Sequence, residues 1–438
     1  MKTPIDDFVK KYIEQNPLRL HMPGHKGKAD MGADITEVGG ADSLYEAAGI
    51  ILESEQTAGT LFGCRTFYST EGSSHCIRAM LQLACLHAAE AERRPVVLAG
   101  RNAHRAFITA AALLDFDLHW LYGKDEGYLS CNIDARVVET AILETHPTAL
   151  YLTSPDYLGN RTDIASIAAV CRKHGVLLLV DNAHGAYLKF LPERLHPMDL
   201  GADMCCDSAH KTLPVLTGGA YLHIRPDAPA MLAGEARRAL GLFGSTSPSY
   251  LILRSLDRAN LYLSAHRERL SAFLPKVEAC RKMLEKQGFC MIGDEPLKLT
   301  VNAKKAGYSG IALAQILEKK NIVCEFADPD YLVLMVTPET GEEGLRCLVD
   351  AFSAVERRPE IDLRPPMPGR AERVCSVRTA MFSPREEIAT EEAEGRILAA
   401  ENMGCPPAVP ILVAGERIDK AACKCFEYYG IESVAVLR

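Results

Sequence analysis

Two short apolar runs, each followed at once by polar side chains, constrain the fold of this chain most. The runs are Val176-Leu177-Leu178-Leu179-Val180, followed by Asp181-Asn182-Ala183-His184-Gly185, and 202–206, followed by Asp207-Ser208-Ala209-His210-Lys211-Thr212. Apolar runs of this length are typical of strands buried on both faces, as in a parallel sheet covered by helices. Ligands of such sheets bind outside the carboxyl ends of the strands, so the polar residues after the two runs are the first candidates for a functional site.

Lys211 and Asp181 together predict a cofactor. A desolvated lysine amine can act as a nucleophile at neutral pH, although a lone lysine in a sequence is in most cases a solvated surface residue. Pyridoxal 5'-phosphate requires both groups, a carboxylate for its pyridinium nitrogen and an amine for its aldehyde. The pair therefore favours pyridoxal phosphate as cofactor, with Lys211 as the lysine that forms the Schiff base.

A third part of such a site precedes these strands. The pattern predicts a strand over 66–70, a turn at Glu71-Gly72-Ser73-Ser74 and then a helix. The free amides of a helix N-terminus and two serine hydroxyls would converge there on a phosphate, although serines at a turn are more often simple helix caps. His104, which follows a predicted strand at 96–99, could stack its ring on a flat cofactor.

Strands and helices alternate from Thr66 to Ile224. This predicts an α/β fold with a mainly parallel sheet covered on both faces, and a last strand over 218–224 that runs antiparallel to its neighbour because the turn before it is short. Helical spacing then continues from Tyr250 past Leu284 as one long helix. The predicted divisions are an N-terminal arm (1–60), a large cofactor-binding domain (61–255), a connecting helix with a small α+β domain (256–358) and a C-terminal domain (359–438).

Composition excludes several other classes of protein. The net charge is −8 without a basic run, which disfavours nucleic acid or an anionic membrane surface as partner. No apolar run approaches the roughly 20 residues of a membrane helix, and the N-terminus has no signal-peptide core, so we expect a cytoplasmic protein. Fifteen cysteines occur without paired CxxC spacing, which predicts reduced thiols and no metal site.

The arm predicts an oligomer. It contains little periodic apolar sequence, yet its loop Leu20-His21-Met22-Pro23-Gly24-His25-Lys26-Gly27 concentrates polar groups. We therefore expect a homodimer or a higher oligomer, with active sites that chains share. The predicted helix start at Thr246-Ser247-Pro248 lies outside the alternating pattern and could bind a partner's phosphate.

With these motifs in place, the chain resembles the ornithine/lysine/arginine decarboxylases of pyridoxal-phosphate fold type I, in their short bacterial form. The resemblance spans about residues 19–420. The motifs that carry it are 21–27, Asp34-Ile35-Thr36-Glu37, Gly72-Ser73-Ser74, Arg101-Asn102-Ala103-His104, Asp181-Asn182-Ala183-His184-Gly185, Asp207-Ser208-Ala209-His210-Lys211-Thr212-Leu213, Thr246-Ser247-Pro248 and Cys405-Pro406-Pro407-Ala408-Val409-Pro410.

The resemblance implies roles for these residues. Lys211 would bind the cofactor covalently, Asp181 would pair with the pyridinium nitrogen and His104 would stack on the ring. His184 would lie near the ring oxygen or the departing carboxylate. The residues implied at or near the phosphate are Gly72, Ser73, Ser74, Ser208, His210 and Thr246. The proton donor to Cα stays open among His210, Lys211 and His184, and the implied reaction is decarboxylation of a basic amino acid.

Some positions depart from the family pattern. They are Asn182 for a glutamate, Arg105 for a lysine, Gly218 for a glutamine, His75 for a smaller or polar residue and Tyr45 for a histidine. None removes a group that the chemistry must have, but together they leave the substrate open. The alternatives are another reaction on the same fold, such as that of an aminotransferase or a carbon-sulfur lyase, and a catalytically silent paralogue that acts as a binding subunit.

Overall fold

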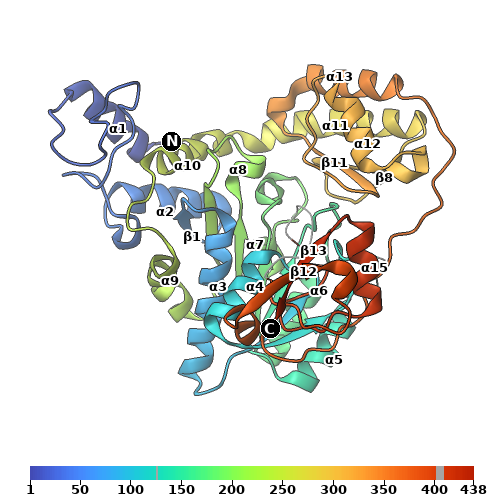
Figure 1. Cartoon of the computed structure of the whole chain (residues 1–438). Coiled ribbons are helices and arrows are strands. Elements are labelled where there is room, and N and C mark those ends of the chain that lie inside the picture. The colour runs from blue at the N-terminus through green and yellow to red at the C-terminus, as the bar shows by residue number, and fades with distance from the viewer. Residues whose placement is uncertain (125–126, 401–408) are drawn as a thin grey trace. The chain divides into compact units, whose positions relative to one another are not determined.

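The computed structural model describes residues 1–124, 127–400 and 409–438 (Figure 1). The chain forms two compact units. The first contains residues 1–98, 135–154 and 163–270, and the second contains residues 99–134, 155–162 and 271–438. The two apolar runs at 176–180 and 202–206 both belong to the first unit.

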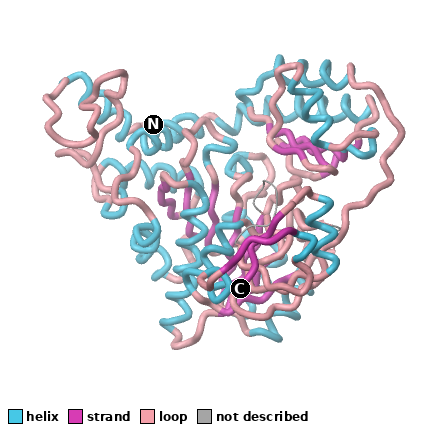
Figure 2. Tube along the Cα trace, viewed as in Figure 1, coloured by secondary structure: helices cyan, strands magenta, loops and turns pink. Residues whose placement is uncertain are grey.

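A seven-stranded sheet is the main structure, with its strands magenta in Figure 2. Its strand order is β1-β7-β6-β5-β4-β2-β3, and the sheet is mixed: β4, β5 and β6 are parallel, whereas β7 is antiparallel to both β6 and β1. This confirms the predicted α/β fold and the predicted antiparallel strand. The bounds are β1 (Arg65–Ser69), β2 (Val96–Gly100), β3 (Asp117–Leu121), β4 (Ala149–Thr153), β5 (Leu177–Asp181), β6 (Met204–Asp207) and β7 (Ala220–Ile224).

Helices of the first unit pack on this sheet. Helix α3 contacts β1, β5, β6 and β7, while α6 contacts β5 and α7 contacts β6. Local sequence sets helix ends: Asp163 accepts the amide of Ser166 at the start of α6, and Gly175 ends it with φ +67°. The bounds are α1 (Pro4–Gln15), α2 (Ile50–Phe62), α3 (Gly72–Glu90), α5 (Ala135–Thr145), α6 (Ile164–His174), α7 (Pro197–Leu200), α8 (Ala209–Thr212), α9 (Ala230–Phe243) and α10 (Tyr250–Ser264).

The N-terminal segment is anchored in the first unit at its start. Helix α1 packs against α2 and α10, with Ile5 and Val9 fully buried. The backbone N–H of Asp6 donates to Asp257. Beyond α1, the loop at 21–27 is fixed by its own contacts, because His25 accepts the N–H of Gly27 and donates to Asp34 at 3.1 Å.

The prediction of one long helix from Tyr250 past Leu284 is wrong at one point. The helix starts at Tyr250, after Pro248, and it is interrupted at Ala265, so α10 is followed by a separate helix, α11 (His266–Lys286). Both helices carry apolar residues at helical spacing. A one-residue interruption leaves that spacing almost unchanged, so the pattern could not reveal it.

The second unit contains two small sheets. One has the antiparallel order β10-β11-β9-β8 and the other pairs β12 with β13. The sequence patterns did not predict β8, a strand of three residues. The bounds are β8 (Cys290–Ile292), β9 (Lys298–Asn302), β10 (Phe326–Ala327), β11 (Tyr331–Met335), β12 (Arg385–Ala389) and β13 (Ser433–Leu437), with α4 (Arg105–Leu114), α12 (Gly310–Glu318), α13 (Gly341–Ser353), α14 (Val377–Met381) and α15 (Lys420–Tyr428).

None of the helices in the described parts of the chain is long and apolar enough to cross a membrane.

The core of the second unit joins its C-terminal segment to the segment before α5. Tyr128 and Leu129 are buried with Phe426 and Val436 in one hydrophobic cluster. The tail after the proline-rich stretch at 359–368 is therefore an integral part of this unit.

Candidate active site

Lys211 and His184 meet at the edge of the sheet. Lys211 lies in α8, the single helical turn after β6, and His184 lies in the loop after β5. The Nζ of Lys211 is 2.9 Å from the Nε2 of His184. Because β5 and β6 are parallel neighbours, their carboxyl ends lie at the same edge, which is why residues so far apart in sequence come into contact.

Asp181 ends β5 and is a buried carboxylate, 2 % exposed. Its Oδ2 accepts the hydroxyl of Tyr151 at 3.0 Å, and its Oδ1 accepts the N–H of Ala183 at 3.1 Å and the thiol of Cys206 at 3.6 Å. Burial, and then the neighbouring Asp181, raise the pKa of Tyr151 well above its usual range, so Tyr151 stays a donor. Among the described residues, no lysine, arginine or histidine forms an ion pair with Asp181. A buried charge without a cation is costly, so this carboxylate is suited to a cationic ligand.

A second buried carboxylate, Asp207, ends β6, and sequence reasoning assigned it no role of its own. Its Oδ2 accepts the Nε2 of His196 at 3.0 Å and that of His223 at 3.2 Å, and its Oδ1 accepts the amide of Asn182 at 2.7 Å. Burial alone would raise the pKa of Asp207, but the two histidines outweigh it and hold the pKa well below its usual range. Asp207 is therefore an ionised group whose partners the chain itself supplies.

The atoms of His196, Asp207 and His223 are close enough together to hold a metal ion. However, the Nδ1 of His196 accepts the N–H of Met198 at 3.3 Å at the start of α7. A neutral imidazole with an accepting Nδ1 carries its proton on Nε2, which here faces Asp207. The three side chains are thus joined by hydrogen bonds that already use these atoms.

The phosphate turn predicted from sequence is the first turn of α3. This helix begins at Gly72, so Ser73 and Ser74 lie inside it, and the Oγ of Ser208 donates to the Oγ of Ser73 at 2.8 Å. Gly72 has φ +73°, and no atom outside its chain neighbours and the backbone of its own helix lies within 4 Å of where a Cβ would stand. The first turn of α3 and the loop before Lys211 therefore meet beside open space.

Gly218, in the loop between α8 and β7, forms a backbone hydrogen bond with the phosphate turn. Its carbonyl accepts the N–H of Gly72 at 2.7 Å. Its φ is +96°, and a Cβ there would lie 2.8 Å from the carbonyl oxygen of Thr70. A glycine is needed for this close approach, which gives a structural reason for one departure from the family pattern.

The remaining predicted residues lie on several different elements. The Nδ1 of His210 donates to the carbonyl of Gly219 at 3.0 Å, at the base of the lysine turn. Thr246 is exposed, in the loop between α9 and α10. His104 belongs to the second unit, where its Nδ1 accepts the N–H of Ala106 at 3.1 Å at the start of α4. Of the C-terminal motif 405–410, positions 405–408 lie outside the described residues.

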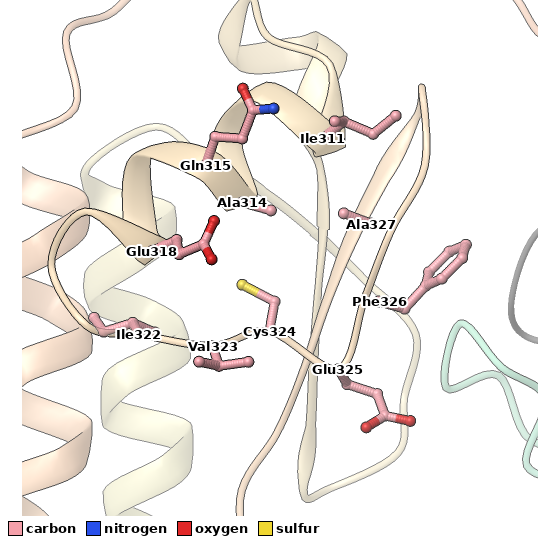
Figure 3. A pocket seen from close by; sticks show the side chains of 10 residues that line it. All are labelled: Ile311, Ala314, Gln315, Glu318, Ile322, Val323, Cys324, Glu325, Phe326 and Ala327. Atoms are coloured by element: carbon pink, nitrogen blue, oxygen red, sulfur yellow. The ribbon is translucent and has the colours of Figure 1, made fainter. Parts of the chain in front are cut away.

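A groove of about 370 Å³ in the second unit contains none of the predicted site residues (Figure 3). Burial, and then Glu318, raise the pKa of the Cys324 thiol in this groove to about 11, which keeps the thiol protonated near neutral pH. The groove is lined by Ile311, Ala314, Gln315, Glu318, Ile322, Val323, Cys324, Glu325, Phe326 and Ala327.

Comparison with known families identifies a matching family model. Residues 3–295 match the model of the Orn/Lys/Arg decarboxylase major domain. Among curated relatives, the uncharacterized protein YaaO of Bacillus subtilis is 30% identical over 96% of this chain and 92% of its own length. An arginine decarboxylase of Halalkalibacterium halodurans is 28% identical, with the same two coverages.

Solved structures agree in fold. Lysine decarboxylase A of Pseudomonas aeruginosa aligns with a TM-score of 0.82 and 16% identity, over 99% of this chain and 80% of its own. The constitutive lysine decarboxylase of Escherichia coli aligns with a TM-score of 0.77 and 18% identity, over 100% of this chain and 82% of its own. At such identities the structures support the fold and say nothing about the substrate.

Proposed function

Because the chain belongs to the Orn/Lys/Arg decarboxylase family, whose members depend on pyridoxal phosphate, we propose that it removes the α-carboxylate of a basic amino acid as carbon dioxide. The products would be carbon dioxide and the polyamine precursor that corresponds to arginine, lysine or ornithine. The observation that carries the proposal is the contact of Lys211 with His184, at the same strand ends as a buried Asp181 that has no ion-pair partner among the described residues.

The side chains of the first unit fit pyridoxal phosphate. The carboxylate of Asp181 accepts from a hydroxyl, an amide and a thiol, all neutral, which leaves its charge for a pyridinium. The hydroxyls of Ser73 and Ser208 meet at the N-terminus of α3, where free amides favour an anion, and the space beside Gly72 is open. Each end of the cofactor thus has a complementary group.

The roles of these residues follow from their chemistry. When bound, pyridoxal phosphate supplies an electron sink for the bond that breaks to release carbon dioxide. Asp181 would hold the proton on the pyridinium nitrogen, and Lys211 would bind the aldehyde carbon. At 2.9 Å, the Nε2 of His184 is able to exchange a proton with the Nζ of Lys211, which makes these two residues candidates for proton transfer at Cα.

The test is a panel of amino acids incubated with the purified holoenzyme, with carbon dioxide and amine release measured. We expect arginine to be the preferred substrate, ahead of lysine and ornithine, since two curated relatives at 28% identity are named arginine decarboxylases. Release of carbon dioxide only from acidic or apolar amino acids would contradict the proposal. Conversion of amino acids to keto acids without carbon dioxide would favour an aminotransferase.

The covalent role of Lys211 has its own test. Borohydride reduction of the holoenzyme, followed by peptide mapping, is expected to place the pyridoxyl group on this residue. Lys189 provides an internal control, because it lies on a different segment of the first unit and is paired with Asp199 at 2.5 Å. A pyridoxyl group on Lys189 or on any other lysine would refute the assignment.

We also propose that the active unit is a dimer with shared sites. Leu18 and Leu20 on the loop after α1 are each 84% exposed, which is unusual for two leucines so close together and supports a surface covered by another chain. Lys211→Ala and His25→Ala chains, refolded together, test the idea. If the loop serves the partner's site, statistical mixing should restore about a quarter of the wild-type activity. No recovery in verified mixed dimers would place the loop outside the partner's site.

A further inference from the structure

The proposed mechanism leaves one buried histidine next to the phosphate turn without a role. His75 follows Ser73 and Ser74 in the first turn of α3 and is 1% exposed. Its Nε2 lies 2.6 Å from the carbonyl oxygen of Leu240 in α9. A carbonyl oxygen only accepts hydrogen bonds, so the Nε2 of His75 carries a proton.

The other ring nitrogen contacts the end of β1. The Nδ1 of His75 lies 2.8 Å from the Oγ of Ser69. Burial lowers the pKa of His75, which favours the neutral ring, and in a neutral ring with a protonated Nε2 the Nδ1 accepts. Ser69 therefore donates its hydroxyl proton to His75.

Ser69 in turn holds the backbone of the phosphate turn. Its Oγ accepts the N–H of Glu71 at 3.1 Å. Glu71 is the residue before α3 and makes no side-chain cap, so this bond and the bond from Gly72 to Gly218 fix the path of the chain into the helix. A continuous series of hydrogen bonds thus runs from Leu240 through His75 and Ser69 to the first turn of α3.

Contacts behind His75 limit its movement. The ring of Tyr45 meets His75 edge-on, with centroids 6.2 Å apart and planes at 89°. Tyr45 packs against Gly241 and Gly244 at the end of α9, and a Cβ on Gly244 would stand 1.8 Å from the Tyr45 hydroxyl oxygen. The N–H of Ser245 also donates to the Glu71 side chain at 2.6 Å. The end of α9 therefore supports the phosphate turn at two points.

We infer that His75 is a positioning residue that, held between Leu240 and Ser69, sets the geometry of the phosphate turn and hence the affinity for the phosphate group of the cofactor. The inference rests on the proposed function, because it takes the first turn of α3 as the phosphate seat of pyridoxal phosphate. The inferred role of His75 concerns the phosphate end of the cofactor only. A histidine that merely stabilised the fold would affect both ends alike.

The test compares pyridoxal phosphate with pyridoxal, which lacks the phosphate. Apoprotein of the wild type and of His75→Phe is titrated with each compound, and the dissociation constants are measured by absorbance. Phenylalanine keeps the ring but makes neither hydrogen bond. We expect the preference for pyridoxal phosphate over pyridoxal to fall roughly 2- to 13-fold, the range for one net hydrogen bond. His87→Phe, at the other end of α3, is the matched control and is expected to keep the wild-type preference.

Ser69→Ala removes the other end of the same bond and is expected to lower the preference to the same degree. The double variant should add little further loss, because the two residues act as a unit. If His75→Phe does not fold, Ser69→Ala decides the question. An unchanged preference, or an equal loss of affinity for both compounds, overturns the inference. A wild-type protein that binds pyridoxal as tightly as pyridoxal phosphate overturns the proposed function itself.

Discussion

Two aspartates end neighbouring parallel strands of the first unit, and their surroundings differ. Asp181 at the end of β5 is 2% exposed and accepts only from neutral groups. Asp207 at the end of β6 is fully buried and accepts from two histidines and an amide. Burial is nearly equal at the two positions, so burial alone does not distinguish a binding carboxylate from a structural one.

The two aspartates differ in whether the chain itself provides a histidine partner for the carboxylate. The charge of Asp207 is stabilised by His196 and His223, and nothing further is needed to keep it ionised. The charge of Asp181 has no such partner among the described residues, and we assign that place to the cofactor. The comparison predicts different results for the two substitutions to alanine, in stability and in activity.

Asp207→Ala is expected to have the largest effect, on stability. It leaves two buried imidazoles and an amide without their acceptor, and each buried donor left unsatisfied costs about 1–3 kcal/mol. Urea unfolding of the apoprotein measures the free energy. The control Asp227→Ala removes an acid that is 76% exposed and is expected to change it by less than about 1 kcal/mol. A similar loss in both variants would show that the Asp207 network adds nothing.

Asp181→Ala should destabilise the apoprotein less than Asp207→Ala does, because removal of a buried charge without a counter-ion offsets part of the loss of an acceptor for Tyr151. Its effect is on turnover, which we expect to fall on the order of 10³-fold at saturating cofactor, equivalent to about 4 kcal/mol. Carbon dioxide release measures it. A loss of apoprotein stability as large as that of Asp207→Ala would mean that Asp181 is a structural residue.

His266 extends the comparison to a buried group without any partner. It is fully buried between Phe190 and Tyr262, and neither ring nitrogen has a hydrogen-bond partner among the described residues. Burial, and then Arg269, lower the pKa of His266 to about 4. The unfolded chain therefore binds the proton first, and folding stability decreases as the pH falls from about 6.5 towards 4.

His266→Phe removes this titration. The variant is expected to lose less stability than the wild type between pH 7 and pH 5, by no more than about 3 kcal/mol. Chemical unfolding at several pH values measures the difference. Parallel stability curves for the two proteins would show that His266 has an ordinary pKa.

His104 gives the smallest expected effect. We predict that it orients the cofactor ring by stacking, worth about 0.5–1.5 kcal/mol beyond burial, so turnover should fall roughly 2- to 13-fold. His104→Asn tests the stacking more directly than His104→Ala does, because asparagine can still accept the N–H of Ala106 at the start of α4. A loss of turnover as large as that of Asp181→Ala would contradict the proposal that Asp181 acts on the electrons of the cofactor ring whereas His104 only orients the ring.

The sequence predicted the parts of the fold that local patterns determine. Continuous apolar runs predicted β5 and β6. Their parallel pairing places the Nζ of Lys211 2.9 Å from the Nε2 of His184, a contact that the sequence did not predict. The three-residue strand β8 is too short for a periodic signal, and the interruption between α10 and α11 keeps the apolar spacing. The partners of Asp207 were missed because His196 and His223 lie on other elements and form no motif with it.

The network around Asp207 has a consequence for folding kinetics. Asn182 follows β5, His196 precedes α7 and His223 lies in β7, so all three segments must be assembled around β6 before the carboxylate has its donors. Interactions that form after the folding transition state slow unfolding and leave the folding rate almost unchanged. We therefore expect Asp207 to lower the unfolding rate of the first unit. The unfolding rate in turn sets how long the strand ends that carry Asp181 and Lys211 stay together once the chain has folded.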